Sequence, residues 1–325
     1  MEKVLTALNA AMERGERAVL CAVVAAEGSA PRHAGAKMAV LADGTAIGTI
    51  GGGAVEQEAI ALSRTLLDTG GTVVRNFALH PAQQDQLNMI CGGTVTLMFC
   101  CLCPDDEENR RLLCRWLELE KTDGAYYLRF SQRVGERQLR ILMPQELLHE
   151  PALAGAFWDG EVYLEKIERA KRVLLFGGGH VGRALVGVLA AVGFRVWVLD
   201  EREEIAKREN FPAAERVIRC SFADISAAVA VEREDYVVIM TPGHQSDYEI
   251  LHQILPKDAA YVGCIGSRRK AAVVRERLAG AGFGEKEIAR IHSPIGLAIG
   301  AQTPEEIAVS IAAEMIAHRA NDVKE

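Results

Sequence analysis

Apolar and polar positions alternate along this chain in two different ways. In residues 170–325, short apolar runs take turns with segments of helical spacing, the β-α-β order typical of a parallel sheet with helices on both faces. In residues 1–169, several strand-like runs occur with few long helical segments. The pattern therefore predicts an α/β protein with a parallel-sheet C-terminal domain at 170–325 and an N-terminal α+β domain at 1–169.

The clearest unit of the C-terminal pattern is RVLLFGGGHVGRALVGVLAAVGFRVWVLD, residues 172–200. Its elements are, in order, a buried strand at 173–176, a glycine turn, a helix at 183–192 and a second strand at 194–199. In the turn, Gly177, Gly179 and Gly182 have the G-x-G-x-x-G spacing, and Asp200 ends the second strand. Such a turn offers a helix N-terminus to phosphate, and the acid binds ribose hydroxyls. The unit predicts a Rossmann-like domain that binds a nucleotide or a pyrophosphate.

Further loops of this domain should meet at the same edge of the sheet, because ligands of such sheets bind beyond the carboxyl ends of the strands. Strands are predicted at 217–220, 235–240 and 260–265, and helices at 222–229, 247–255, 268–279 and 304–317. The candidate cofactor-binding residues here are Gly177, Gly178, Gly179, His180, Gly182, Asp200, Thr241, Gly243, Gly266 and Ser267. His244 is a candidate catalytic acid–base group, since an unperturbed imidazole titrates near neutrality. An ordinary loop histidine is the alternative.

A second glycine cluster lies in the N-terminal half. Strands at 37–41 and 45–50 form a predicted hairpin, and the following glycines lead directly into a helix at 54–67. Backbone N–H groups at a helix N-terminus make an anion cradle, although the glycines also suit a tight turn without a ligand. The candidate cofactor-binding residues of this half are Ser29, Arg32, Gly51, Gly52, Gly53 and Glu56.

One cysteine differs from the others. Cys91 precedes two glycines in a turn before an apolar run at 94–102, where a sulfur can be presented outward. Thiolate chemistry requires that access and a nearby positive group or amide donors. We therefore take Cys91 as a candidate catalytic residue and metal ligand, with a structural turn cysteine as the alternative. The C-C-x-C run at 100–103 does not have a standard zinc spacing, so its thiols are expected to be buried or incidental.

Composition narrows the choice of partners. The chain has 325 residues, enough for about two domains. A net charge of −7 argues against a general electrostatic grip on nucleic acid or an anionic membrane. No uncharged apolar run of ~18 residues occurs, and residues 2–14 predict a charged amphipathic helix with no signal-peptide core. We expect a cytoplasmic location and reduced thiols for the 8 cysteines.

The combination of motifs resembles the XdhC/CoxI family, accessory proteins for molybdenum hydroxylases such as xanthine dehydrogenase. In the first half the resemblance is carried by GSAPRHAGAKMAV (28–40), GTIGGGAVEQEAI (48–60) and CGG (91–93). In the second half it is carried by FGGGHVGRAL (176–185), WVLDERE (197–203), TPGHQSDYEIL (241–251), YVGCIGSRRK (261–270) and PIGLAIGAQTPEEIAVSIAAEMI (294–316). Members are understood to bind molybdenum cofactor, favour its sulfurated form and help deliver it to the apo-hydroxylase.

The resemblance implies an accessory protein that helps sulfurate, protect and insert molybdenum cofactor, in its molybdopterin or dinucleotide form, and not a stand-alone catalyst. A glycine loop would hold the terminal phosphate or pyrophosphate, and Cys91 would lie at the metal end, since thiolates suit thiophilic centres. The implied partners are a molybdenum hydroxylase and a sulfur donor such as a cysteine desulfurase. The prevalence of two-fold homo-oligomers favours a homodimer.

Two other functions remain open at this point. One is an NAD(P)-dependent oxidoreductase, in which Asp200 holds the adenosine ribose and His244 donates a proton. The other is a partner-docking chaperone whose nucleotide fold binds no ligand.

Overall fold

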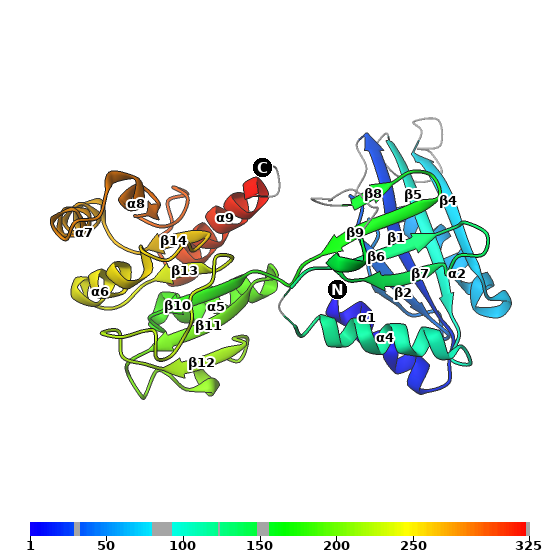
Figure 1. Ribbon diagram of the computed structural model, residues 1–325, viewed down its shortest axis with the longest axis horizontal. Coiled ribbons are helices and arrows are strands. Elements are labelled where there is room, and N and C mark those ends of the chain that lie inside the picture. Colours follow the sequence, from blue (N-terminus) through cyan, green and yellow to red (C-terminus); the bar gives the residue numbers. More distant parts are fainter. Residues whose placement is uncertain (29–32, 80–92, 123, 148–155, 323–325) are drawn as a thin grey trace. The chain divides into compact units, whose positions relative to one another are not determined.

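The computed structural model describes residues 1–28, 33–79, 93–122, 124–147 and 156–322 (Figure 1). The chain divides into two compact units, Met1–Arg169 and Ala170–Glu325. Among the described helices, none is long and apolar enough to cross a membrane.

The N-terminal unit is built on a five-stranded antiparallel sheet of order β3-β2-β1-β5-β4. Its strands are β1 (Ala18–Gly28), β2 (Lys37–Leu41), β3 (Ala46–Gly48), β4 (Thr72–Leu79) and β5 (Gly93–Leu102), and the unit's helices are α1 (Glu2–Glu13), α2 (Gly53–Thr69) and α4 (Glu107–Leu119). The sheet is buried on both faces. In β1, Leu20 faces one core, shared with α1 and α4, and Cys21 faces the other, shared with α2. This period of two explains why β1 is a continuous apolar run.

A second antiparallel sheet, of order β7-β6-β9-β8, completes the unit. Its elements are β6 (Tyr126–Ser131), β7 (Leu139–Leu142), the 3-10 turn η2 (Pro144–Glu146), β8 (Ala156–Trp158) and β9 (Val162–Ile167). Side chains of β6 and β9 enter the same core as α1 and α4. The two sheets are also joined by an ion pair, in which the buried Lys37 ammonium lies 2.5 Å from the Glu165 carboxylate. Burial lowers the pKa of Lys37, and Glu165 opposes that shift.

The C-terminal unit contains a six-stranded sheet of order β12-β11-β10-β13-β14-β15, in which every neighbouring pair is parallel. Its strands are β10 (Arg172–Phe176), β11 (Arg195–Asp200), β12 (Arg216–Arg219), β13 (Tyr236–Ile239), β14 (Tyr261–Cys264) and β15 (Ile291–His292). Its helices are α5 (His180–Ala191), the 3-10 turn η3 (Arg208–Asn210), α6 (His244–Ile254), α7 (Arg268–Gly280), α8 (Glu285–Ala289) and α9 (Pro304–Asp322).

Helices cover both faces of this sheet. Apolar residues of α5 and α9 pack on one face, and those of α6 and α7 pack on the other (Figure 1). The sequence prediction of an α/β protein with a Rossmann-like parallel sheet and an N-terminal α+β part is confirmed. The strand order reverses between β10 and β13, the point at which such sheets bind ligands.

The predicted helix at 222–229 is wrong, because this segment forms turns. The Asp224 side chain accepts hydrogen bonds from the backbone and hydroxyl of Ser226, and the Ile225 N–H donates to the side chain of Gln253. These side-chain bonds replace the backbone bonds of a helix.

Candidate functional site

The G-x-G-x-x-G turn joins β10 to α5, and its three glycines differ in surroundings. Gly177 has a φ of +104°, and a Cβ there would lie 2.4 Å from the Met240 carbonyl oxygen. A Cβ on Gly182 would lie 2.5 Å from the Gly177 carbonyl oxygen. At Gly179, in contrast, a Cβ would meet no atom within 4 Å. The first and third glycines therefore allow the helix to pack on the strand, whereas the second leaves open space beside the backbone, as the approach of a pyrophosphate requires.

Two helix N-termini end at this rim of the sheet. Gly179 is the N-cap of α5 and Gly243 is the N-cap of α6, and neither provides a side chain that caps the first turn. The first N–H groups of a helix have no partner within the helix and carry partial positive charge. His180 and His244 are the first residues of α5 and α6. The predicted rim therefore presents two uncapped sets of amide donors, from the strands on either side of the point where the order reverses.

His180 also lines a cavity. The cavity measures about 420 Å³ and lies between α5 and the start of α9. Its other lining residues are Arg183, Ala184, Val188, Pro304 and Glu305. His244 does not line this cavity, so the two candidate histidines have different surroundings.

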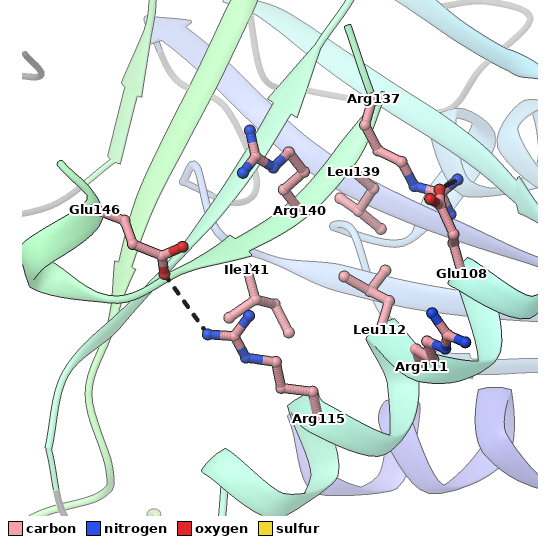
Figure 2. Close-up of a pocket in the computed structure, with 9 residues that line it drawn as sticks. All are labelled: Glu108, Arg111, Leu112, Arg115, Arg137, Leu139, Arg140, Ile141 and Glu146. Atoms are coloured by element: carbon pink, nitrogen blue, oxygen red, sulfur yellow. Dashed lines mark ion pairs between the residues drawn. The ribbon is translucent and has the colours of Figure 1, made fainter.

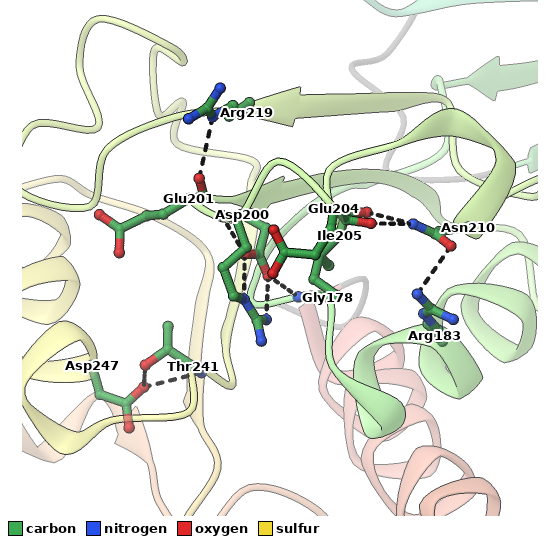
Figure 3. Close-up of polar contacts among 11 residues, drawn as sticks. Gly178, Arg183, Asp200, Glu201, Glu204, Ile205, Asn210, Arg219, Thr241 and Asp247 are labelled. Atoms are coloured by element: carbon green, nitrogen blue, oxygen red, sulfur yellow. Dashed lines mark hydrogen bonds and ion pairs between the residues drawn. The ribbon is translucent and has the colours of Figure 1, made fainter.

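Asp200 is buried, and its carboxylate is fully engaged with the chain itself (Figure 3). One oxygen accepts hydrogen bonds from the Arg202 N–H and Nε, both at 2.9 Å. The other accepts from the Gly178 N–H at 2.8 Å and from a terminal nitrogen of Arg202 at 2.7 Å. Burial opposes ionisation, but the bonds from Arg202 and Gly178 outweigh it and hold the pKa of Asp200 below its usual value. Since a carboxylate has about four acceptor positions, a ribose hydroxyl would have to displace Arg202.

The loop after β11 closes over Gly178. A Cβ on Gly178 would lie 2.6 Å from the Phe211 ring and 2.8 Å from Ile205. Asn210 fixes this loop, because its amide nitrogen donates to the carbonyls of Glu204 and Ile205 and its oxygen accepts from Arg183 of α5 (Figure 3). Gly178 is thus a packing position, in contrast to the open Gly179.

Thr241 and Asp247 form a buried polar contact after β13 (Figure 3). An oxygen of Asp247 accepts hydrogen bonds from the Thr241 hydroxyl at 2.5 Å and its N–H at 3.2 Å. The other oxygen has no hydrogen-bond partner among the described residues, but it lies 2.5 Å from the Lys270 ammonium, whose side chain is 28% exposed. At this distance the ion pair satisfies the oxygen electrostatically, so we regard Asp247 as paired.

The sequence prediction did not include Asp247 or Lys270. Asp247 shares the buried face of α6 with Ile250, Leu251 and Ile254. An acid at an apolar-face position of a helix is a signal that the sequence offered, because a buried carboxylate requires a partner.

Ser267 and Gly266 lie at the start of α7. The Ser267 hydroxyl accepts a hydrogen bond from the Lys270 N–H at 3.3 Å and so caps the helix. A Cβ on Gly266 would lie 3.0 Å from the Lys270 side chain. The structure therefore gives Ser267 a capping role, and Gly266 provides room for Lys270.

The glycine loop of the N-terminal unit, Gly51 to Gly53, is held by hydrogen bonds to the side chain of Glu56. A single carboxylate oxygen of Glu56 accepts hydrogen bonds from the N–H groups of Ile50 at 3.2 Å and Gly52 at 3.1 Å, and from the Thr49 hydroxyl at 2.7 Å. Gly52 has a φ of +77°, and a Cβ there would meet nothing within 4 Å. Glu56, itself a predicted cofactor-binding residue, therefore uses the Gly52 amide that the sequence analysis assigned to an external anion.

Three predicted residues lie outside the described part of the chain: Ser29, Arg32 and Cys91. Among the described cysteines, those on strands are buried, with Cys100 and Cys101 in opposite cores. Burial raises the pKa of Cys264 to about 12, and the neighbouring Asp247 adds to the shift. The described residues contain no group of three or more side chains that would hold a metal ion.

Two family descriptions match this chain. That of the XdhC Rossmann domain matches residues 173–315, and that of the XdhC and CoxI family matches residues 11–78. The chain belongs to the XdhC and CoxI family. This membership confirms the resemblance seen in the sequence motifs.

Named relatives of the chain include two bacterial proteins that align over most of their length. One, from Bacillus subtilis, is named as a probable subunit of xanthine dehydrogenase; it is 27% identical, and the match covers 97% of both chains. The molybdenum cofactor insertion chaperone PaoD of Escherichia coli is 23% identical, covering 95% of this chain and 86% of PaoD. The uncharacterized protein YqeB of Escherichia coli is 28% identical, and this chain spans 42% of its length.

A solved structure shows the same fold. The crystal structure of a protein named as a xanthine dehydrogenase from Bacillus halodurans has a TM-score of 0.82 and 24% identity, and covers 98% of this chain and 96% of that chain.

Proposed function

We propose that this protein is a molybdenum cofactor-binding accessory protein that protects the cofactor and inserts it into a molybdenum hydroxylase. The supporting observation is the open backbone at Gly179, at the uncapped N-terminus of α5, in a chain of the XdhC and CoxI family. A relative, PaoD, carries the name of a molybdenum cofactor insertion chaperone. The proposal includes a cytoplasmic location.

The residues at the rim suit the charged end of such a cargo. The cofactor is a pterin dithiolene that ends in a phosphate or, in its dinucleotide form, continues through a pyrophosphate. In the proposed complex, the amides after Gly179 bind the phosphate oxygens, because the helix dipole favours an anion there. The Lys270 ammonium, oriented by Asp247, is a second positive group at the same edge of the sheet. The loop from Thr241 to Gly243 is also part of the proposed phosphate site.

For the N-terminal unit, we propose Cys91 as the residue that meets the cofactor's metal. A thiolate is a ligand that suits a thiophilic centre, and it also suits the handling of sulfur supplied by a cysteine desulfurase. We propose Ser29, Arg32 and the loop at Gly51 to Gly53 as further cofactor-binding residues of the N-terminal unit, considered by itself. The loop can contribute more amides only if Glu56 releases Ile50 and Gly52, since it now accepts their hydrogen bonds.

Phosphate binding at the start of α5 is tested with the variant Gly179→Val, and Gly187→Val is its control. Gly187 is an exposed residue of the same helix, and a Cβ there also meets nothing within 4 Å. After expression in molybdenum-replete cells, we expect the pterin and molybdenum that co-purify with Gly179→Val to fall by about tenfold or more, because a side chain fills the approach of the phosphate. Gly187→Val should retain its load. Equal loading of both variants would place the site elsewhere.

The role of Cys91 is tested by Cys91→Ser. We expect the variant to bind less cofactor, or to bind it and fail to activate the apo-hydroxylase. Normal cofactor binding together with normal activation would exclude Cys91 from the metal end. A cofactor load that persists without activation would assign Cys91 to sulfur handling.

The alternative, an NAD(P)-dependent oxidoreductase, has less support from the geometry. Its ribose contact is Asp200, whose acceptor positions are already bonded to Gly178 and Arg202. A binding scan with NAD, NADP and molybdenum cofactor separates the two functions. Tight NAD binding with a substrate-dependent absorbance change would favour the enzyme.

A further inference from the structure

A groove lined by arginines lies in the N-terminal unit, between helix α4 and strand β7 (Figure 2). It measures about 370 Å³. Its lining consists of Glu108, Arg111, Leu112, Arg115, Arg137, Leu139, Arg140, Ile141 and Glu146. Four arginines against two glutamates give the groove a charge of +2, in a chain whose net charge is −7.

The groove has an apolar floor and a charged rim. Leu112, Leu139 and Ile141 form the floor, and the last two are only 4% exposed. The α4 residues recur at the three- and four-residue spacing of one helix face. Figure 2 shows Leu139 and Ile141 of β7 facing α4, with Arg111 and Arg115 beside this floor, whereas Arg140 extends from the opposite side of β7. This combination suits a ligand that carries carboxylates on either side of an apolar group.

The arginines differ in how readily they accept a new partner. Arg137 is held by Asn109, Asp106 and Glu108. Arg140 is exposed, and no ion pair or hydrogen bond of its side chain occurs within the described part of the chain.

Arg111 and Arg115 each have one exposed acidic partner, Glu107 at 2.5 Å and Glu146 at 3.6 Å. Exposed pairs of this kind contribute about 0–1 kcal/mol, so exchanging their partner costs little. Three guanidinium groups are thus available to an incoming acid.

Charge and burial also indicate the kind of partner. β7 is the edge strand of its sheet, but the low exposure of Leu139 and Ile141 leaves little of its backbone open to an added strand. Contact must therefore come from side chains. A second β7 from another copy would bring two Arg140 side chains together, and like charges directly opposite are destabilising.

We propose that this groove docks an acidic peptide segment of a partner protein, with one apolar side chain on the floor and carboxylates paired with Arg111 and Arg115. A further carboxylate pairs with Arg140, beyond the edge of β7. Arginine forms planar two-point contacts with carboxylates, which fixes register as well as charge. The inference concerns the N-terminal unit and holds whether or not the proposed cofactor function does.

The test uses the full chain and fluorescein-labelled peptides in a polarisation assay. The probe has the sequence Glu-Glu-Asp-Leu-Glu-Glu, and two others replace its leucine by serine or its acids by lysine. We expect saturable binding of the probe, loss of about tenfold in affinity with serine, and no binding with lysine. Arg140→Glu should weaken the probe by about tenfold or more. Arg110→Glu, an exposed change on α4 outside the groove, should have no such effect.

Several results would overturn the inference. If the serine peptide binds as well as the leucine peptide, the groove is a simple anion site. The same conclusion follows if inorganic phosphate, at a concentration that carries the same total charge as the probe, displaces the probe. If a single-stranded oligonucleotide binds more tightly than the probe, the partner is a nucleic acid. If Arg140→Glu converts a dimer into a monomer in sedimentation, the occupant is a second copy. Equal weakening by Arg110→Glu would mean that overall charge, and not the groove, attracts the peptide. Thermal unfolding of each variant confirms that it is folded.

Discussion

The two glycine loops have similar sequences, but their amide groups differ in how they are hydrogen-bonded. Each places glycines between a strand and a helix, and each has an acid bonded to a loop amide. In the N-terminal unit, Glu56 accepts hydrogen bonds from the N–H groups of Ile50 and Gly52 and from the Thr49 hydroxyl. In the C-terminal unit, Asp200 accepts a hydrogen bond from only one amide of the glycine loop, that of Gly178. Helix α5, which follows this loop, has no side-chain cap.

The position of the acid explains this difference. Glu56 belongs to the helix that its loop feeds, so its side chain folds back and bonds the amides of its own turn, in the manner of a capping box. Asp200 ends the neighbouring strand β11 and reaches the loop through Gly178, whose surroundings are already packed. The space at Gly179 stays open. A glycine-rich turn before a helix therefore predicts an anion site only when no acid of the chain itself is placed to fill it.

The largest contrast is expected from alanine substitution of one glycine in each loop. Gly177→Ala should cost about 3 kcal/mol or more, because a positive φ adds to a Cβ contact with backbone. That contact is with the Met240 carbonyl oxygen at 2.4 Å, whereas a Cβ on Gly52 meets nothing within 4 Å. Gly52→Ala should cost less, about 1–3 kcal/mol, from its backbone conformation alone (φ +77°, ψ −173°). Denaturant titration with hydrogen exchange assigns the loss to each unit. Equal costs would mean that backbone conformation, and not packing, dominates in both loops.

The next effect concerns the acid of the first loop. Glu56→Ala removes the acceptor of three hydrogen bonds and should destabilise the N-terminal unit by about 2 kcal/mol. Amide exchange at Gly52 should accelerate, and added phosphate should restore part of the stability if the freed amides bind an anion. Glu58→Ala, an exposed change on the same helix, is the control and should have little effect. No change in exchange at Gly52 would show that Glu56 does not hold the loop in solution.

A smaller effect follows from the pKa of Asp200, which is lower in the folded protein than its ordinary value. A depressed carboxyl pKa stabilises the folded state above the unfolded pKa of about 3.9, and this contribution is lost as pH falls through the folded pKa. Asp200→Asn should therefore cost about 1 kcal/mol at pH 7 and make the C-terminal unit less sensitive to acid. Unfolding titrations between about pH 2 and pH 5 measure this slope. Parallel profiles for the two proteins would contradict the linkage.

The sequence predicted elements whose pattern is local. The hairpin at 37–50 and the strand–turn–helix at 172–192 follow from period, glycine spacing and turn residues, and both are present. The helices α5 and α6 begin at His180 and His244, three residues earlier than predicted in each case. Their first turns contain glycine or polar residues that favour loops, so propensity alone assigns them to the preceding turn.

Contacts between distant segments were not predictable in the same way. Lys270 meets Asp247 only because α6 and α7 pack on the same face of the sheet. The arginine groove likewise joins α4 to β7, with no motif in either segment. The sequence could reveal that Asp247 needed a partner, because it lies on an apolar helix face, but it could not identify that partner.

The smallest change in stability is expected from Arg202→Ala. This variant tests whether removing the guanidinium frees the Asp200 carboxylate to bind a ribose hydroxyl. The Arg202 side chain is 36% exposed, so solvent screening limits the loss to under about 1 kcal/mol. The variant removes both side-chain hydrogen bonds from Arg202 to Asp200 and leaves the one from the backbone N–H. If Asp200 is held away from ribose only by this guanidinium, affinity for an adenosine nucleotide should rise about tenfold by calorimetry, since a buried acid regains a hydroxyl partner. Arg219→Ala, an exposed arginine paired with Glu203 beyond the loop, is the control. If neither variant gains affinity, Asp200 serves to hold Gly178 and does not contact ribose.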